Sequence, residues 1–239
     1  MRLDISELTQ IFPEFCVAAV MVGGASIQPR SADLAQEIAS RGAEFRNQWG
    51  AAPLSEIPGI KVWRAAYRVF GIKKTSYRCS VEWLAKNAQA ERPMPEINAF
   101  VDAYNAVSLS HVMPLGADDL DCLSGDIAFR YAREGDDFRN MGVSDENGNP
   151  GPRSQSKTSE VVYADGEKIL CRRWNWRQDG RSLVTAKTSR AVVTVQLNGA
   201  GVLEDAVSDR RDMLQRHCGG TSVAVIADAA NSVVDLPGI

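Results

Sequence analysis

The octapeptide CRRWNWRQ, in the second half of the chain, places two tryptophans among three arginines although the formal net charge is −3. Alternate side chains of an extended strand face opposite ways. Trp174 and Trp176 would then share one face, and Arg173, Asn175 and Arg177 the other. Aromatic rings and guanidinium groups stack on nucleic-acid bases, at about 1–3 kcal/mol per base. We expect the tryptophans in the core and the arginine face toward an RNA end; the opposite arrangement would make the rings the stacking platform.

These two faces make different predictions for substitutions. A core tryptophan cut to alanine typically costs about 3–5 kcal/mol, so Trp174→Ala should give an unstable protein. Asn175→Ala should leave thermal stability nearly unchanged and weaken ligand binding, because it removes only a polar group that faces the ligand.

Positive charge is concentrated in two segments of the sequence. Six lysines and arginines lie in residues 61–78 and seven in residues 168–190, so these two basic clusters hold thirteen of the 27 in the chain. On a helix, Lys61, Arg64 and Arg68 fall within about 60° of one another, away from the apolar stripe. Such asymmetry indicates a polyanionic partner, or else a solvated helix face and arginines that pair with acids elsewhere. The candidates for RNA contact are Lys61, Arg64, Arg68, Lys73, Lys74, Arg172, Arg173 and Arg177.

No catalytic triad or metal motif is recognisable. The two histidines are expected to be structural, with His217 capping the end of a helix. Arginines next to Cys171 would lower the pKa of a thiol, but no histidine is near it in the sequence, so a nucleophilic role is not expected. The acids of GADDLDCLSGD lack the spacing of an EF-hand loop and read as a turn with capping acids. We expect no metal and no cofactor.

Composition limits the class of protein. A chain of 239 residues with 44% hydrophobic residues can bury a sizeable core, and a pI near 5.5 argues against general DNA or membrane binding. Five dispersed cysteines fit a reducing compartment, and the N-terminal run has no signal-peptide core. We expect a cytoplasmic protein; its oligomeric state is not indicated.

Periodicity predicts helices first and strands afterwards. FCVAAVMVGG reads as a strand buried on both faces, and Ser31 as the N-cap of the following helix. Further helices are predicted after Pro58 and near 79–89, 97–110 and 202–217. Strands are predicted at DIAFRYAR, EVVYAD, ILCRRW, RAVVTVQL and TSVAVIA.

This order favours an α+β fold with a mixed or antiparallel sheet over a βαβ alternation. The Gly-, Ser-, Pro- and Asn-rich segment at about 142–159 is expected to be an exposed loop. It is either a domain boundary or, as we favour, an excursion within a single domain 1–239 whose residues 200–239 form a helix–strand extension.

Residues 60–135 carry a recognisable pattern. INAFVDAYNAV, PLGADD and LSG resemble the runs INNVVDVTNYV, PLHAFD and L-x-G of the B3/B4 domain in the phenylalanyl-tRNA synthetase beta subunit, and of free-standing proteins that consist of that domain. Ser182, Val184 and Thr188 match its later S-x-V-x-x-x-T pattern. In the synthetase this domain hydrolyses tyrosine wrongly esterified to tRNA, so the resemblance implies a B3/B4-like fold and a tRNA or aminoacyl-tRNA partner.

Two departures from the synthetase bear on the reaction. The histidine of PLHAFD falls on Gly116, and the glutamate that reads the tyrosine hydroxyl falls on Thr194, so tyrosine-specific editing is not expected. The resemblance implies trans-editing of another mischarged aminoacyl-tRNA; the alternative is a non-catalytic RNA-binding module. The cleft is expected near Asn105, Gly116, Asn175 and Thr194, with no residue singled out as catalytic.

Overall fold

The computed structural model describes residues 1–73, 76–142, 154 and 156–239. In this part of the chain six α-helices accompany two sheets of six and four strands, which confirms the α+β class. The helices are α1 (Ser6–Thr9), α2 (Ala32–Trp49), α3 (Pro58–Val69), α4 (Ser80–Gln89), α5 (Ala99–His111) and α6 (Leu203–Cys218). The strands are β1 (Arg2–Asp4), β2 (Phe15–Gly23), β3 (Leu115–Asp119), β4 (Ile127–Tyr131), β5 (Val161–Ala164), β6 (Ile169–Arg172), β7 (Arg177–Gln178), β8 (Arg190–Asn198), β9 (Thr221–Ala227) and β10 (Val233–Asp235).

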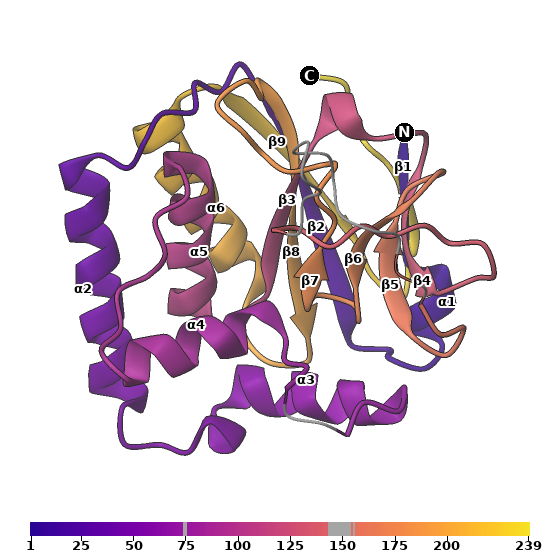
Figure 1. Ribbon diagram of the computed structural model, residues 1–239, viewed down its shortest axis with the longest axis horizontal. Helices are drawn as coiled ribbons and strands as arrows, with labels where there is room; N and C mark the ends of the chain where they lie inside the picture. The colour runs from indigo at the N-terminus through magenta and orange to yellow at the C-terminus, as the bar shows by residue number, and fades with distance from the viewer. Residues whose placement is uncertain (74–75, 143–153, 155) are drawn as a thin grey trace.

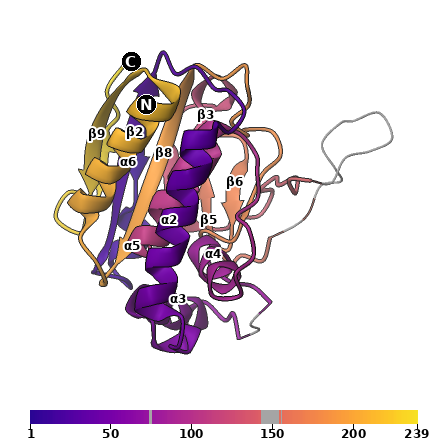
Figure 2. The same cartoon turned by 90° about the vertical axis from the view of Figure 1, so that its left-hand side faces the viewer.

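The molecule is layered, with a helical layer and two sheets (Figure 1). The four-stranded sheet, in the order β3-β8-β2-β9, lies in the middle. Helices α2, α5 and α6 cover one of its faces, as the turned view shows (Figure 2). The six-stranded sheet, in the order β10-β1-β4-β5-β6-β7, faces the other side, and α3 and α4 lie across one end (Figure 1).

Strand β2 explains why the four-stranded sheet is central. Its side chains alternate between two hydrophobic cores: Val17, Ala19 and Met21 pack toward the six-stranded sheet, whereas Ala18 and Val20 pack under the helices. A strand with apolar partners on both faces needs a continuous apolar run rather than an alternating one. The prediction that FCVAAVMVGG is buried on both faces is confirmed.

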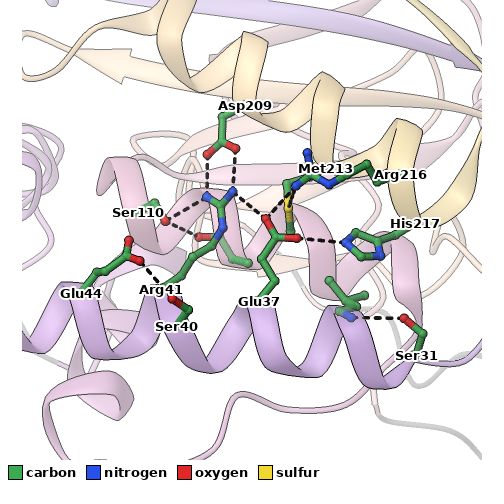
Figure 3. A network of polar contacts seen from close by, with 12 residues as sticks. Ser31, Glu37, Ser40, Arg41, Glu44, Ser110, Asp209, Met213, Arg216 and His217 are labelled. Carbon is green, nitrogen blue, oxygen red and sulfur yellow. Dashed lines mark hydrogen bonds and ion pairs between the residues drawn. The ribbon is translucent and has the colours of Figure 1, made fainter.

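A polar network joins the helices of the outer layer (Figure 3). Arg41 of α2 donates to both carboxylate oxygens of Asp209 in α6, at 2.6 and 2.7 Å. Glu37 accepts from Arg216 and lies 3.1 Å from the ring of His217. The predicted Ser31 cap is confirmed, since its hydroxyl accepts from the Leu34 amide at 3.2 Å. His217 lies in the last turn of α6, as predicted, and its ring contacts Glu37 on α2.

Segments far apart in the sequence meet in both sheets. β1 pairs with β10 and β2 with β9, so residues 200–239 contribute α6 to the helical layer and one edge strand to each sheet. The predicted loop at 142–159 falls mostly outside the described residues. No helix in the described part of the chain is long and apolar enough to cross a membrane.

One prediction about the acids needs correction. The first four residues of GADDLDCLSGD, expected in a turn, belong to strand β3, which pairs with β8. Only its end behaves as predicted: the Asp119 carboxylate caps the short 3₁₀ helix that follows, accepting from the Asp121 amide at 3.0 Å.

Candidate functional site

A cavity of about 450 Å³ opens between the two sheets at the end where α4 lies. The four residues expected in the cleft, Asn105, Gly116, Asn175 and Thr194, all line it. Its volume is in the range of small-molecule sites. The side chains that matter below come from six places: Trp83 of α4, Tyr104 and Asn105 of α5, Asp118 of β3, Tyr163 of β5, Asn175, Trp176, Arg177 and Gln178 around the β6–β7 turn, and Thr194 and Gln196 of β8.

Strands β8 and β3 form the floor of this cavity. In β8, Val193 and Val195 pack under the helices, so Thr194 and Gln196 point to the opposite face, between the sheets. β3 repeats this pattern, with Gly116 paired to Thr194 and Asp118 on the same face. Polar side chains are rarely placed on the inner face of a buried strand, so this floor is polar for a reason other than packing.

The octapeptide does not form one continuous strand, which corrects our prediction. Residues 173–176 are a tight turn between β6 and β7, and Arg173 and Trp174 both have left-handed backbone angles, with φ of 47° and 68°. Trp174 is fully buried against Phe12, Phe15 and Trp63, as predicted for a core residue. Trp176 is only half-buried and lines the cavity instead of sharing that core.

The turn places Asn175 inside a series of hydrogen bonds that runs from Tyr67 to Thr194. The Tyr67 hydroxyl donates to Asn175 Oδ1 at 2.8 Å, and Asn175 Nδ2 donates to Gln196 Oε1 at 3.0 Å. Gln196 Nε2 then donates to Thr194 Oγ1 at 3.3 Å. Burial raises the pKa of Tyr67 well above its ordinary value, so this phenol remains a donor and sets the direction of the chain. The hydroxyl hydrogen of Thr194 is left over for a partner in the cavity.

These hydrogen bonds also correct the expectation that Asn175→Ala leaves thermal stability nearly unchanged. Asn175, Tyr67 and Gln196 are all buried. Removing the amide therefore leaves the Tyr67 hydroxyl without its acceptor and Gln196 Oε1 without its donor, both in the protein interior.

Asp118 is the one carboxyl group on the described lining of the cavity. Its Oδ1 accepts from the Ser182 hydroxyl at 2.6 Å and from Gln178 Nε2 at 3.0 Å. Burial raises the pKa of Asp118 to about 7, against the opposing effect of these two donors. The cavity therefore carries a carboxyl group that gains or loses its proton near neutrality.

The rim of the cavity is aromatic and cationic. The Arg173 guanidinium lies 3.7 Å from the centre of the Tyr77 ring and 4.3 Å from that of Trp176. Arg177 is exposed and lies 5.3 Å from the centre of the same indole. Across the opening, Trp83 of α4 is 48% exposed. Such rings and cations form a surface on which a nucleic-acid base could stack.

The first basic cluster is only partly available to a ligand. Lys61, Arg68 and Lys73 are exposed, whereas Arg64 donates to both oxygens of the buried Glu82, at 3.1 and 2.7 Å. The expectation of one uniform cationic face on α3 is corrected, because Arg64 balances an interior charge. Lys74 lies outside the described residues.

The second basic cluster is mostly neutralised within the fold. Arg172 is buried and donates to both oxygens of Glu160 at 2.9 Å, so we leave it out of the candidate RNA surface. Lys168 and Arg181 have acid partners too, at 2.6 Å from Asp165 and 2.8 Å from Asp179. The alternative that these cations pair with acids elsewhere therefore holds for most of the cluster, with Arg177 at the rim as an exposed exception.

Neither Cys171 nor the two histidines are placed to act as a nucleophile or base in this cavity. Burial, reinforced by the charge of Asp118, raises the pKa of Cys171, so this thiol stays protonated and unreactive. Both histidines contact acids in the helical layer, His111 at 3.0 Å from Asp209 and His217 at 3.1 Å from Glu37. Among the described residues no group of three or more His, Cys, Asp and Glu is arranged to hold a metal ion.

Comparison with known proteins identifies the family. The profile of the B3/4 domain matches residues 62–236, most of the chain. The chain belongs to the B3/4 domain family. Among solved structures it is similar to an N-terminal fragment of the phenylalanyl-tRNA synthetase beta subunit from Pyrococcus horikoshii, with 11% identity and a TM-score of 0.46. That match covers 94% of this chain and 53% of the fragment, so this chain spans about half its length. No curated protein matches the chain.

Sequence reasoning missed several residues of the B3/4 cavity. Gln196 had a detectable signal, because RAVVTVQL places two polar residues two apart inside an otherwise apolar strand. Asp118 had a weaker one, masked by the neighbouring acids that suggested a turn. Tyr163, Gln178 and Trp83 gave no signal, since only the tertiary fold brings them to the cavity.

Proposed function

We propose that this B3/4 protein binds aminoacyl-tRNA in the cytoplasm and hydrolyses mischarged aminoacyl esters in trans. The observation that supports it best is the cavity of about 450 Å³, which brings together the four residues expected from the resemblance to the synthetase's editing domain. An aminoacyl group with its terminal ribose needs a concave site of this size, lined by apolar walls and a few polar groups.

The burial gradient across the cavity suggests how the ligand lies. The floor, with Thr194, Gln196 and Asp118, is nearly inaccessible, and suits the side chain of the amino acid. The rim, with Trp83, Trp176 and Arg177, is open and suits the bases and phosphates of the RNA end. The ester, which joins the two, then lies between floor and rim, beside Asn105.

The chemistry that this arrangement supports is attack by water on the ester carbonyl carbon. An aminoacyl ester is already activated, so orientation and hydrogen-bond donors are the main requirements. Asn105 is half-buried on α5, and its side chain has no hydrogen-bond partner among the described residues. Its amide oxygen can hold the water and its amide nitrogen can donate to the carbonyl oxygen as negative charge develops. The neighbouring ribose hydroxyl supplies a further donor.

Exposed cations are the expected contacts to phosphate. Arg177 is exposed at the opening, and Arg68, Lys61 and Lys73 are exposed on the surface. Arg173 is half-buried between the rings of Tyr77 and Trp176 and could contribute by stacking. Affinity for tRNA should then fall steeply with salt, because each phosphate contact releases counterions.

The test is to incubate the protein with a panel of mischarged tRNAs and measure ester loss and binding separately. Asn105→Ala should lower kcat/KM for ester loss about tenfold or more. Asn87→Ala is the matched control, because Asn87 is a half-buried asparagine on α4 that does not line this cavity. Binding without hydrolysis of any ester would favour the non-catalytic RNA-binding module. Neither binding nor hydrolysis would refute both readings.

A further inference from the structure

We propose that Asp118 makes this cavity selective for an aminoacyl group whose side chain ends in a protonated amine. The inference rests on the proposed function for the identity of the ligand, but it is argued from the floor of the cavity alone. It concerns which amino acid is accepted, whereas the proposed function concerns what is done to the ester.

The first observation is that one oxygen of the Asp118 carboxylate accepts no hydrogen bond from the described residues. Ser182 and Gln178 both donate to Oδ1, and Oδ2 has no hydrogen-bond partner in the part of the chain that the structure describes. Asp118 is 3% exposed and lines the cavity. Oδ2 is therefore the carboxylate oxygen that remains to accept a hydrogen bond from a ligand in the cavity.

The second observation is that the cavity contains another polar atom without a hydrogen-bond partner, the Tyr163 hydroxyl. The Tyr163 hydroxyl lies on the cavity wall, is buried, and has no hydrogen-bond partner among the described residues. Burial raises the pKa of Tyr163 and of Tyr104, the negative charge of Asp118 adds to both rises, and both rings line the same cavity as the carboxylate. The floor therefore offers one anionic oxygen, one phenol oxygen and two aromatic rings to the same ligand group, and an ammonium group suits all of these.

The third observation is the charge of the surroundings. Burial is the main cause of the raised pKa of Asp118; Lys168 lowers it and Asp165 raises it. Lys168 and Asp165 are paired with each other at 2.6 Å. Of the two arginines on the described lining, Arg177 is exposed at the rim and Arg78 lies 3.3 Å from the buried Glu82. The carboxyl group is thus short of positive charge, and a cation delivered by the ligand would restore its ionised form.

Depth decides which part of the ligand reaches Asp118. The α-amino group of an aminoacyl ester is one carbon from the carbonyl, so it stays with the ester near the rim. Asp118 is on the floor with Thr194 and Tyr163. A long side chain can span this difference, as that of lysine or ornithine does, whereas the α-amino group cannot.

The test compares an acceptor-stem RNA charged with lysine against the same RNA charged with norleucine, which keeps the chain but lacks the amine. Wild type should hydrolyse the lysyl ester with a kcat/KM roughly 10- to 100-fold higher, the range expected for a hydrogen bond to a charged group. Asp118→Asn keeps an oxygen for Ser182 and Gln178 and should abolish this preference by slowing only the lysyl ester. Asp119→Asn is the matched control, since Asp119 is a buried neighbour bonded to Thr188 outside the cavity.

A second arm uses lysinamide and norleucinamide, which carry no ester, in a binding titration. Tighter binding of lysinamide to wild type, lost in Asp118→Asn, supports the inference even if no ester is cleaved. Equal kcat/KM for the lysyl and norleucyl esters, with equal affinity for lysinamide and norleucinamide, overturns the inference and leaves the proposed function unaffected. A stronger preference for a glutaminyl ester would overturn the requirement for a cation. Equal loss of both ester hydrolyses in a folded Asp118→Asn protein would make Asp118 a general base, and would overturn it as well.

Discussion

Asn175→Ala tests the chain of hydrogen bonds that holds the cavity floor. The side chain links Tyr67 to Gln196, at 2.8 and 3.0 Å, and both partners are 4% exposed. Leaving one buried polar group unsatisfied costs about 1–3 kcal/mol, so two such groups set a range of about 2–6 kcal/mol. Water from the adjoining cavity can replace part of the lost amide, which favours the low end, about 2–3 kcal/mol. That is a large share of a typical stability of about 5–15 kcal/mol.

The assay is urea unfolding followed by tryptophan fluorescence. A double-mutant cycle with Tyr67→Phe isolates the pair, and its coupling should be about 1–2 kcal/mol. Asn105→Ala, on the same cavity but without a hydrogen-bond partner among the described residues, should change the free energy of unfolding by less than about 0.5 kcal/mol. A loss below about 0.5 kcal/mol in Asn175→Ala, with additive effects in the cycle, would refute the view that this chain is structural as well as functional.

Three further predictions follow from charges in the fold. Arg68→Glu should weaken tRNA binding without loss of stability. Arg64→Glu should destabilise the protein by up to about 3 kcal/mol, because it places a like charge beside the buried Glu82, which keeps only Arg78 at 3.3 Å. Equal thermal midpoints for the two variants would contradict this. Burial lowers the pKa of Arg210 to about 9, and its three side-chain nitrogens have no hydrogen-bond partners among the described residues. Arg210→Met should therefore raise the free energy of unfolding, measured in urea at pH 7, by about 1–4 kcal/mol. The hydrogen bonds from Arg41 and His111 outweigh burial and lower the pKa of Asp209. The contribution of Asp209 to stability is therefore complete above the unfolded pKa of about 4 and is lost as pH falls below that value. The stabilities of wild type and Asp209→Asn should converge as pH falls from about 5 to 2, and a constant difference would exclude this linkage.

The larger elements could be predicted from the sequence because their burial patterns are regular. Helices α2 to α5 show apolar residues at helical spacing, and Ser31 marks the start of α2 as a side-chain cap. Strand β2 is apolar on both faces because it lies between two cores, and β8 is apolar on the face that packs under the helices. In these segments local preference and tertiary contact favour the same structure.

The short strands at one edge of the six-stranded sheet could not be predicted in the same way. β10, the edge strand, and β1 beside it have three residues each; they pair with each other across more than 220 residues of sequence, and β1 also pairs with β4. The ion pairs of the second basic cluster share this difficulty. Arg172 ends β6 and Glu160, twelve residues earlier, lies just before β5, and nothing in either segment shows that their charges cancel.

The octapeptide CRRWNWRQ shows most directly how the fold departs from simple alternation. Left-handed backbone angles at Arg173 and Trp174 cost about 1–2 kcal/mol each in a residue other than glycine. Two hydrogen bonds hold the turn in place, from the Trp174 amide to Val161 at 2.7 Å and from the Ser80 amide to Asn175 at 3.0 Å. The buried Trp174 ring, packed edge-on against three other aromatic rings, adds more stabilisation than the strain removes. The turn therefore sends one tryptophan into the core, the asparagine to the cavity floor, and the second tryptophan with Arg173 to the rim. An extended strand would divide these rings and cations between two faces. The turn instead divides them among the core, the cavity floor and the rim, and the proposed site depends on all three.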